Sequence, residues 1–82
     1  MFKIFRDFSS SNVLELAYAA ETQTCRVIFM SKSGRESSMW LYAPVDEATF
    51  DSIHEAESVG RAVNEMLVGP SKTGAIQARK VG

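Results

Sequence analysis

The spacing of hydrophobic residues changes at Pro44, from every second residue before it to helical spacing after it. Alternation of apolar and polar side chains is typical of β-strands that bury one face. Clusters of Ser, Asn and Gly separate the alternating runs and favour turns. A weaker alternation returns near the C-terminus. The predicted strands span residues 2–8, 13–18, 24–29, 36–43 and 74–81.

The segment between the fourth and fifth predicted strands has the pattern of helices. Asp46 is a suitable N-cap, and Ser58 is a second one that precedes an apolar face over residues 59–68. Gly60 weakens this second helix by roughly 1 kcal/mol relative to Ala. We interpret it either as a point of close approach to another backbone or as a tolerated defect. The dipeptide Gly69-Pro70 predicts the end of the helical region.

These elements predict a mainly β fold with a helical insertion, of the α+β class, in one domain over residues 1–82. If the last strand pairs with the first, the sheet closes into a small, strongly bent, five-stranded antiparallel barrel with the helix between strands 4 and 5. A core this small rarely supplies more than about 3 to 5 kcal/mol without reinforcement. Cys25 is the only cysteine and His54 the only histidine, which excludes an intrachain disulfide and predicts no zinc site. Self-association is the reinforcement that we expect.

The predicted strand 36–43 has apolar side chains on both faces. Trp40 and Tyr42 share one face, and Met39 and Leu41 share the other. Helices of the same chain can cover one face. The second face can be covered by the same chain or by another subunit, and the pattern alone favours neither. If a subunit covers it, the predicted oligomer interface contains Met39, Leu41 and Ile76.

The charged residues are unevenly distributed, although the net charge is only −1. The segment 46–65 holds six acidic residues and one arginine, a net charge of −5, and the total of −1 leaves +4 for the remainder. Basic side chains beside aromatic ones are typical of surfaces that bind single-stranded nucleic acid. Core packing is the alternative role for the aromatic residues, and solvation for the basic ones. The predicted nucleic-acid-binding residues are Arg26, Lys32, Arg35, Trp40, Tyr42, Arg79 and Lys80.

The sequence contains no pattern that predicts catalysis, a metal or a cofactor. Cys25 alternates with polar residues in a predicted strand, where a free cysteine usually behaves as a small buried hydrophobe. His54 lies on the acidic helix, where a solvated or locally paired histidine is commoner than a catalytic one. No apolar run approaches the roughly 20 residues of a membrane span. A lone thiol without a signal peptide favours the cytoplasm.

One set of residues has a distinctive order and spacing: Ser10-Ser11-Asn12-Val13, Tyr18, Val27, Phe29, Tyr42, Pro44 and Ala56-x-Ser58-x-Gly60-x-x-x-Asn64. From about Ser9 to Met66, the chain resembles the KTSC domain. This family is named from the end of some lysyl-tRNA synthetases and also occurs alone in bacterial and phage proteins. The resemblance implies no catalytic residue. The stretch Ser38-Met39-Trp40-Leu41-Tyr42 departs from the Tyr-x-Tyr that is commoner in the family.

The predicted topology is also similar to the Sm/SH3 type of small barrel, whose Sm branch forms rings and binds RNA, although no Sm sequence motif is present. We therefore expect a non-enzymatic, homo-oligomeric module, ring-like if this similarity holds. It would bind RNA or single-stranded DNA through its basic strand face. The alternative is a structural or protein-interaction adaptor that uses a strand edge or the acidic helix and binds no nucleic acid.

Overall fold

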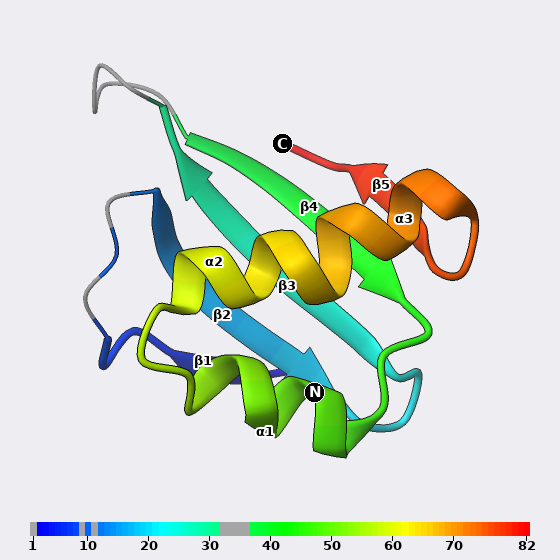
Figure 1. Ribbon diagram of the computed structural model, residues 1–82, viewed down its shortest axis with the longest axis horizontal. Helices are drawn as coiled ribbons and strands as arrows, with labels where there is room; N and C mark the ends of the chain where they lie inside the picture. The colour runs from blue at the N-terminus through cyan, green and yellow to red at the C-terminus, as the bar shows by residue number, and fades with distance from the viewer. Residues whose placement is uncertain (1, 9, 11, 32–36) are drawn as a thin grey trace.

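The computed structural model describes residues 2–8, 10, 12–31 and 37–82. It has two layers, a five-stranded antiparallel sheet and a layer of helices that crosses one face of it (Figure 1). No helix in the described part of the chain is long and apolar enough to cross a membrane. The elements are β1 (Lys3–Phe5), β2 (Val13–Ala19), β3 (Thr24–Met30), β4 (Ser37–Ala43), α1 (Glu47–His54), α2 (Val59–Val63), η1 (Asn64–Val68), α3 (Gly69–Thr73) and β5 (Gln77–Lys80).

The sheet is open rather than closed. Its strands lie in the order in which they occur in the chain, β1-β2-β3-β4-β5, so β1 and β5 are its two edges. The α+β class, the five antiparallel strands and the helical insertion after β4 are therefore confirmed. The pairing of the last strand with the first, which would form a barrel, is wrong. β5 instead pairs with β4, because the helical segment returns the chain across the sheet to the β4 edge.

The helical insertion begins as the sequence predicts but continues further. Asp46 caps α1 by accepting a hydrogen bond from the Thr49 backbone N–H at 2.8 Å, and Ser58 caps α2 in the same way through Arg61. The predicted stop at Gly69-Pro70 is wrong, because α2, η1 and α3 follow one another without a break to Thr73. Proline lacks an N–H and its ring collides with a carbonyl one turn earlier. The wide π-helical turn of η1, directly before Pro70, accommodates both effects.

The core lies between the helices and one face of the sheet. Leu16, Val27, Ile53 and Leu67 are fully buried there. Gly60 marks a close approach, but to side chains rather than to a backbone: a Cβ at this position would collide with the side-chain oxygens of Ser10 and Asn12. The start of α2 therefore packs directly against the segment that precedes β2.

Cys25 lies in this core and has no exposed surface. Burial in apolar surroundings raises the pKa of its thiol to about 12, because the thiolate would lose its hydration. The native protein is therefore expected to leave Cys25 unmodified by a thiol reagent at pH 8, and the unfolded protein to react fully. With a thiol reagent that releases a chromophore on reaction, the absorbance with and without denaturant measures the rate of modification of Cys25. Equal rates in the two states would contradict it.

Candidate functional site

The strand register divides the predicted nucleic-acid-binding residues between the two faces of the sheet. Residues directly opposite each other in an antiparallel pair share a face. Trp40 pairs with Lys80 and packs against the helix-covered core. Leu41 pairs with Arg26 on one side and with Arg79 on the other, which places both arginines on the uncovered face. Lys32 and Arg35 lie outside the described residues.

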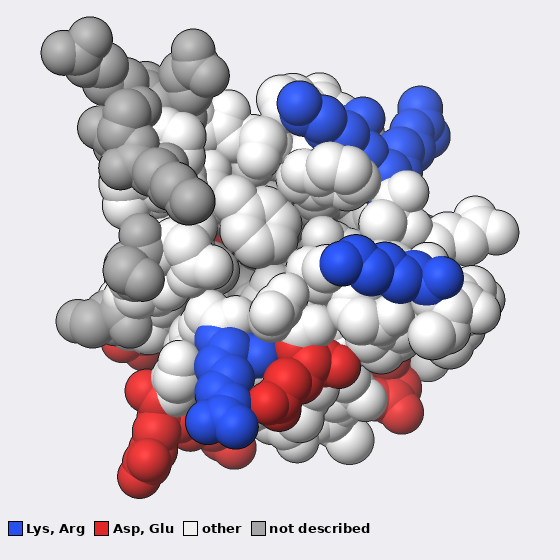
Figure 2. Space-filling view, turned by 45° about the horizontal axis from the view of Figure 1, so that its top comes forward, with Lys and Arg blue, Asp and Glu red and all other residues white. Residues whose placement is uncertain are grey.

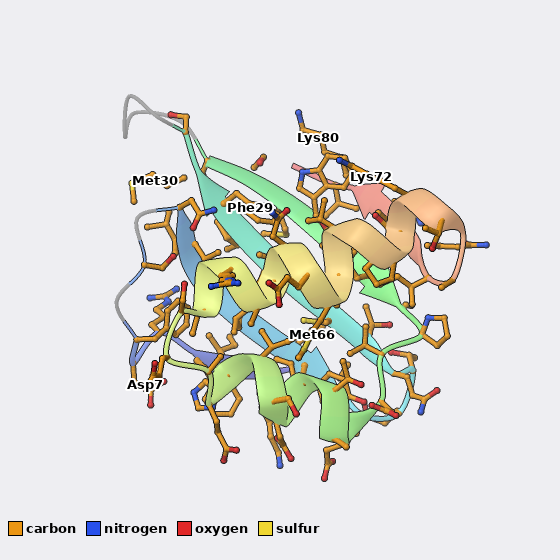
Figure 3. The ribbon with its side chains drawn as sticks, viewed as in Figure 1. Asp7, Phe29, Met30, Met66, Lys72 and Lys80 are labelled. Carbon is orange, nitrogen blue, oxygen red and sulfur yellow. The ribbon has the colours of Figure 1, made fainter. Side chains whose placement is uncertain are left out.

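Trp40 and Lys80 belong to a surface that we call the aromatic–basic surface, which consists of Phe29, Trp40, Lys72 and Lys80. The two aromatic residues are half-buried at the border of the core. Lys72 from α3 and Lys80 from β5 are exposed and lie near each other in Figure 3, and Phe29 from β3 lies in the same upper part of that view. In Figure 2 some of the basic side chains lie at this end and others lie further down, one group of them among the acidic side chains that gather at the opposite end. A hollow of about 270 Å³, lined by Met30, Ser31, Ser37, Ser38 and Lys80, borders this surface.

Tyr42 is buried with 3% of its surface exposed, so its ring is part of the core. It stacks with Trp40, with ring centroids 6.4 Å apart and planes 23° from parallel. Burial raises the pKa of the Tyr42 phenol. This packing holds the indole of Trp40 against the sheet and leaves Tyr42 itself no free ring face for a base.

The uncovered face, which we call the open sheet face, carries the apolar residues Ile28, Met39, Leu41 and Val81. Ile28 pairs with Met39, and the Val81 backbone N–H donates to the Met39 carbonyl at 2.8 Å, so these residues adjoin across three strands. Val81 is 44% exposed. Ile76, predicted with Met39 and Leu41 as an interface residue, packs instead against the core.

The open sheet face also holds a buried carboxylate between two arginines. Glu15 is 3% exposed and accepts hydrogen bonds from Arg6 Nε at 2.8 Å and from an Arg26 terminal nitrogen at 3.1 Å. The Arg26 guanidinium lies 4.8 Å from the centroid of the Phe2 ring, and its Nε is buried without a hydrogen-bond partner in the described part of the protein. The side chain of Arg6 is 74% exposed. This cluster gives the face its charge.

The sequence did not reveal Lys72, Phe29 or the Glu15 cluster as parts of a surface. Lys72 was hidden by the proline two residues before it, because the predicted helix stopped there. In the predicted strand 13–18, the alternation places Glu15 on the face opposite Leu16 and does not indicate that it is buried. An acidic residue among apolar ones in a strand, with one arginine just after the preceding strand and another in the following strand, is the signal that could have indicated the ion cluster.

His54 forms a contact with the segment after β1, which is distant in the sequence, and this differs from the local pairing on the acidic helix that the sequence favours. Its Nε2 lies 2.9 Å from Asp7 Oδ1, and its ring packs 4.2 Å from that of Phe5. The hydrogen bond to His54 lowers the pKa of Asp7 below its ordinary 3.8. The two residues therefore connect the first strand region to the end of α1.

This contact makes a small part of the stability depend on pH. Because the folded protein lowers the pKa of Asp7, its contribution is fully present above pH 3.8 and is lost as the pH falls below that value. We expect the midpoint temperature of unfolding to fall more steeply with acidification in the wild type than in Asp7→Asn. Parallel slopes from pH 7 to about 3 would contradict the assignment.

Comparison with known proteins identifies the same domain over most of the chain. The family model of the KTSC domain matches residues 9–68. The crystal structure of a KTSC domain protein from Yersinia pestis is similar, with a TM-score of 0.69 and 25% sequence identity over 98% of this chain and 100% of that one. A comparison with curated proteins found no match. The Ser10, Asn12 and Gly60 positions, which contact one another, lie within the matched range. The chain therefore belongs to the KTSC domain family.

Proposed function

We propose that this domain is a non-enzymatic module that binds single-stranded RNA or DNA through the aromatic–basic surface. The observation that carries the proposal is the pairing of Trp40 with Lys80 across β4 and β5, with Lys72 near Lys80 and Phe29 in the same upper part of the view in Figure 3. The proposal moves the binding surface from the strand face predicted from the sequence to the helix-covered side. Trp40 and Lys80 remain in it, and Arg26 and Arg79 do not.

The chemistry of these side chains suits an unpaired strand. Every base has an aromatic face, so a half-exposed indole can stack on it without regard to sequence, and such stacking contributes about 1 to 3 kcal/mol per base. The ammonium groups of Lys72 and Lys80 can contact the flanking phosphates. Hydroxyl groups of Ser37 and Ser38 line the adjoining hollow, where they can donate to phosphate oxygens.

Fluorescence polarisation with labelled single-stranded oligonucleotides tests this proposal. We expect the Lys72→Ala/Lys80→Ala double variant to bind more weakly and to lose roughly 1.4 from the slope of log affinity against log salt, since each contact in a single strand contributes about 0.7. Trp40→Leu, which retains apolar contact with the core, is expected to weaken binding about tenfold. Arg61→Ala is the control, because Arg61 is exposed on α2 and paired with Glu65 at 2.9 Å. Absence of binding at tens of micromolar protein, or an effect of Arg61→Ala equal to that of the double variant, would reject the proposal.

The open sheet face favours a second candidate function, in which the domain is a homo-oligomeric or adaptor module. A contiguous set of apolar side chains on an uncovered sheet is typical of a surface that binds protein. Self-association would also reinforce a core of this size. Light scattering over a range of concentrations tests the homo-oligomeric role, because a protein that remains monomeric throughout does not self-associate. We place either function in the cytoplasm, in keeping with the free buried thiol of Cys25.

A further inference from the structure

The described residues of the open sheet face carry a net positive charge. Arg6, Arg26 and Arg79 lie on this face, and Glu15 is the carboxylate that lies among them. Glu15 is buried and already bound by two of the arginines, so it is not available to a cation outside the protein. Three arginines and one glutamate give the face a charge of +2.

This charge opposes the simplest dimer. In a symmetric dimer each open sheet face would meet its own copy, and two surfaces of charge +2 would be brought together with no exposed side-chain carboxylate from the described residues between them. Like charges held at an interface weaken association. The apolar residues therefore need a partner surface that brings negative charge with it.

The protein carries such a surface on its other layer. Glu47 and Asp51 on α1 and Glu55 at its C-cap follow one another at intervals of four residues, so they form one stripe along the helix, and all three are exposed. Lys3 and Glu21 line a hollow with Glu47 and Asp51, and because their opposite charges cancel, the stripe keeps a charge of −3. Small residues, Ala48 and Ser52, lie beside the stripe and allow a close approach.

The two surfaces also match in spacing. Arg26 and Arg79 lie in one row across the sheet with Leu41 between them, two strand spacings or about 10 Å apart. Glu47 and Glu55 are eight residues apart along a helix, about 12 Å. A helix lying across the strands can therefore place a carboxylate near each arginine while its small residues approach Leu41.

We propose that the open sheet face of one copy binds the acidic stripe of α1 (Glu47, Asp51 and Glu55) in a second copy, head to tail. This inference rests on the proposed self-association and specifies its mode. A bound pair still has one free stripe and one free face, so assembly continues until it closes into a ring or extends as a filament. Because the contact combines apolar burial with opposite charges, it is expected to weaken as salt rises.

Charge-reversal variants of the full chain test the mode of assembly by light scattering. Arg79→Glu changes the face and Asp51→Lys changes the stripe, and each alone is expected to raise the dissociation constant at least about tenfold. Mixing the two variants is expected to restore assembly, because each then supplies the charge that the other lacks. Lys80→Glu is the matched control for Arg79→Glu, since the two adjacent residues point to opposite faces of β5. Glu57→Lys, an exposed residue between α1 and α2, is the control for Asp51→Lys.

The outcomes separate the mode from the self-association itself. A wild type that stays monomeric up to about 1 mM would overturn both. Loss of assembly in Leu41→Ser together with no effect of Asp51→Lys would overturn only the head-to-tail contact, because the sheet face would then bind something other than the stripe. Failure of the mixed variants to assemble, when each is folded by circular dichroism, would overturn it as well.

Discussion

Replacing Glu15 with Ala is expected to lower the free energy of unfolding by about 3 kcal/mol, because the change leaves a mostly buried arginine without its counter-charge. The side chain of Arg26 is 20% exposed and its terminal nitrogen donates to Glu15 at 3.1 Å. Without the carboxylate, the contact with the Phe2 ring is the one that the described residues would still offer the guanidinium. Urea denaturation at pH 7 measures this difference in the free energy of unfolding. The dependence of that free energy on urea concentration is expected to have the same slope in the variant and the wild type.

Arg6→Ala is the matched control for this experiment. Arg6 binds the same carboxylate at 2.8 Å, but its side chain is 74% exposed and can return to water at little loss. Exposed ion pairs contribute no more than about 1 kcal/mol, so this variant is expected to stay close to the wild type. If Arg6→Ala destabilised the protein as much as Glu15→Ala, burial would not be the reason for the strength of the cluster.

Replacing Leu67 with Ala is expected to lower the free energy of unfolding by about 3 kcal/mol. Leu67 lies in η1 and has no exposed surface, so its truncation removes buried methyl groups and leaves a cavity beneath the helix layer. The neighbouring Met66 is 38% exposed and points toward solvent between η1 and α1 (Figure 3). Thermal unfolding followed by circular dichroism compares the stability of Leu67→Ala with that of Met66→Ala.

Met66→Ala is expected to change the stability by less than about 1 kcal/mol, because surface substitutions seldom do more. The pair therefore tests the register of the π-helical turn. A shift of the helix by one residue would bring Met66 to the buried position that Leu67 now occupies. A larger loss for Met66→Ala than for Leu67→Ala would show that the helix before Pro70 has the other register.

Most of the fold could be predicted from local patterns, and the errors have definite physical causes. Alternation identified β2, β3 and β4, because each buries one face against the helices. The capping residues Asp46 and Ser58 marked the helix starts correctly, since their side chains bind backbone N–H groups only a few residues away. The predicted end of the helical region at Gly69-Pro70 was wrong. The π-helical turn before the proline lets the helix continue, and the sequence does not reveal that turn.

The surfaces were less accessible to prediction. The sequence predicted Trp40 and Lys80 as nucleic-acid-binding residues, and Met39 and Leu41 as residues of an oligomer interface. It combined Arg26 with Trp40, which the structure places on opposite faces. A pattern of period two says which residues of one strand share a face, but the assignment of faces across strands depends on the register between them. That register is a property of the paired sheet.

The amino-acid sequence by itself determined the class of the fold, the order of its strands and helices and the family to which the chain belongs. These features depend on the side-chain period and on caps that act over a few residues. Only the tertiary structure decided that the sheet stays open, that Glu15 is buried between two arginines and that the basic residues divide between two faces. Each of these depends on contacts between residues distant in the chain, whose geometry local spacing does not contain.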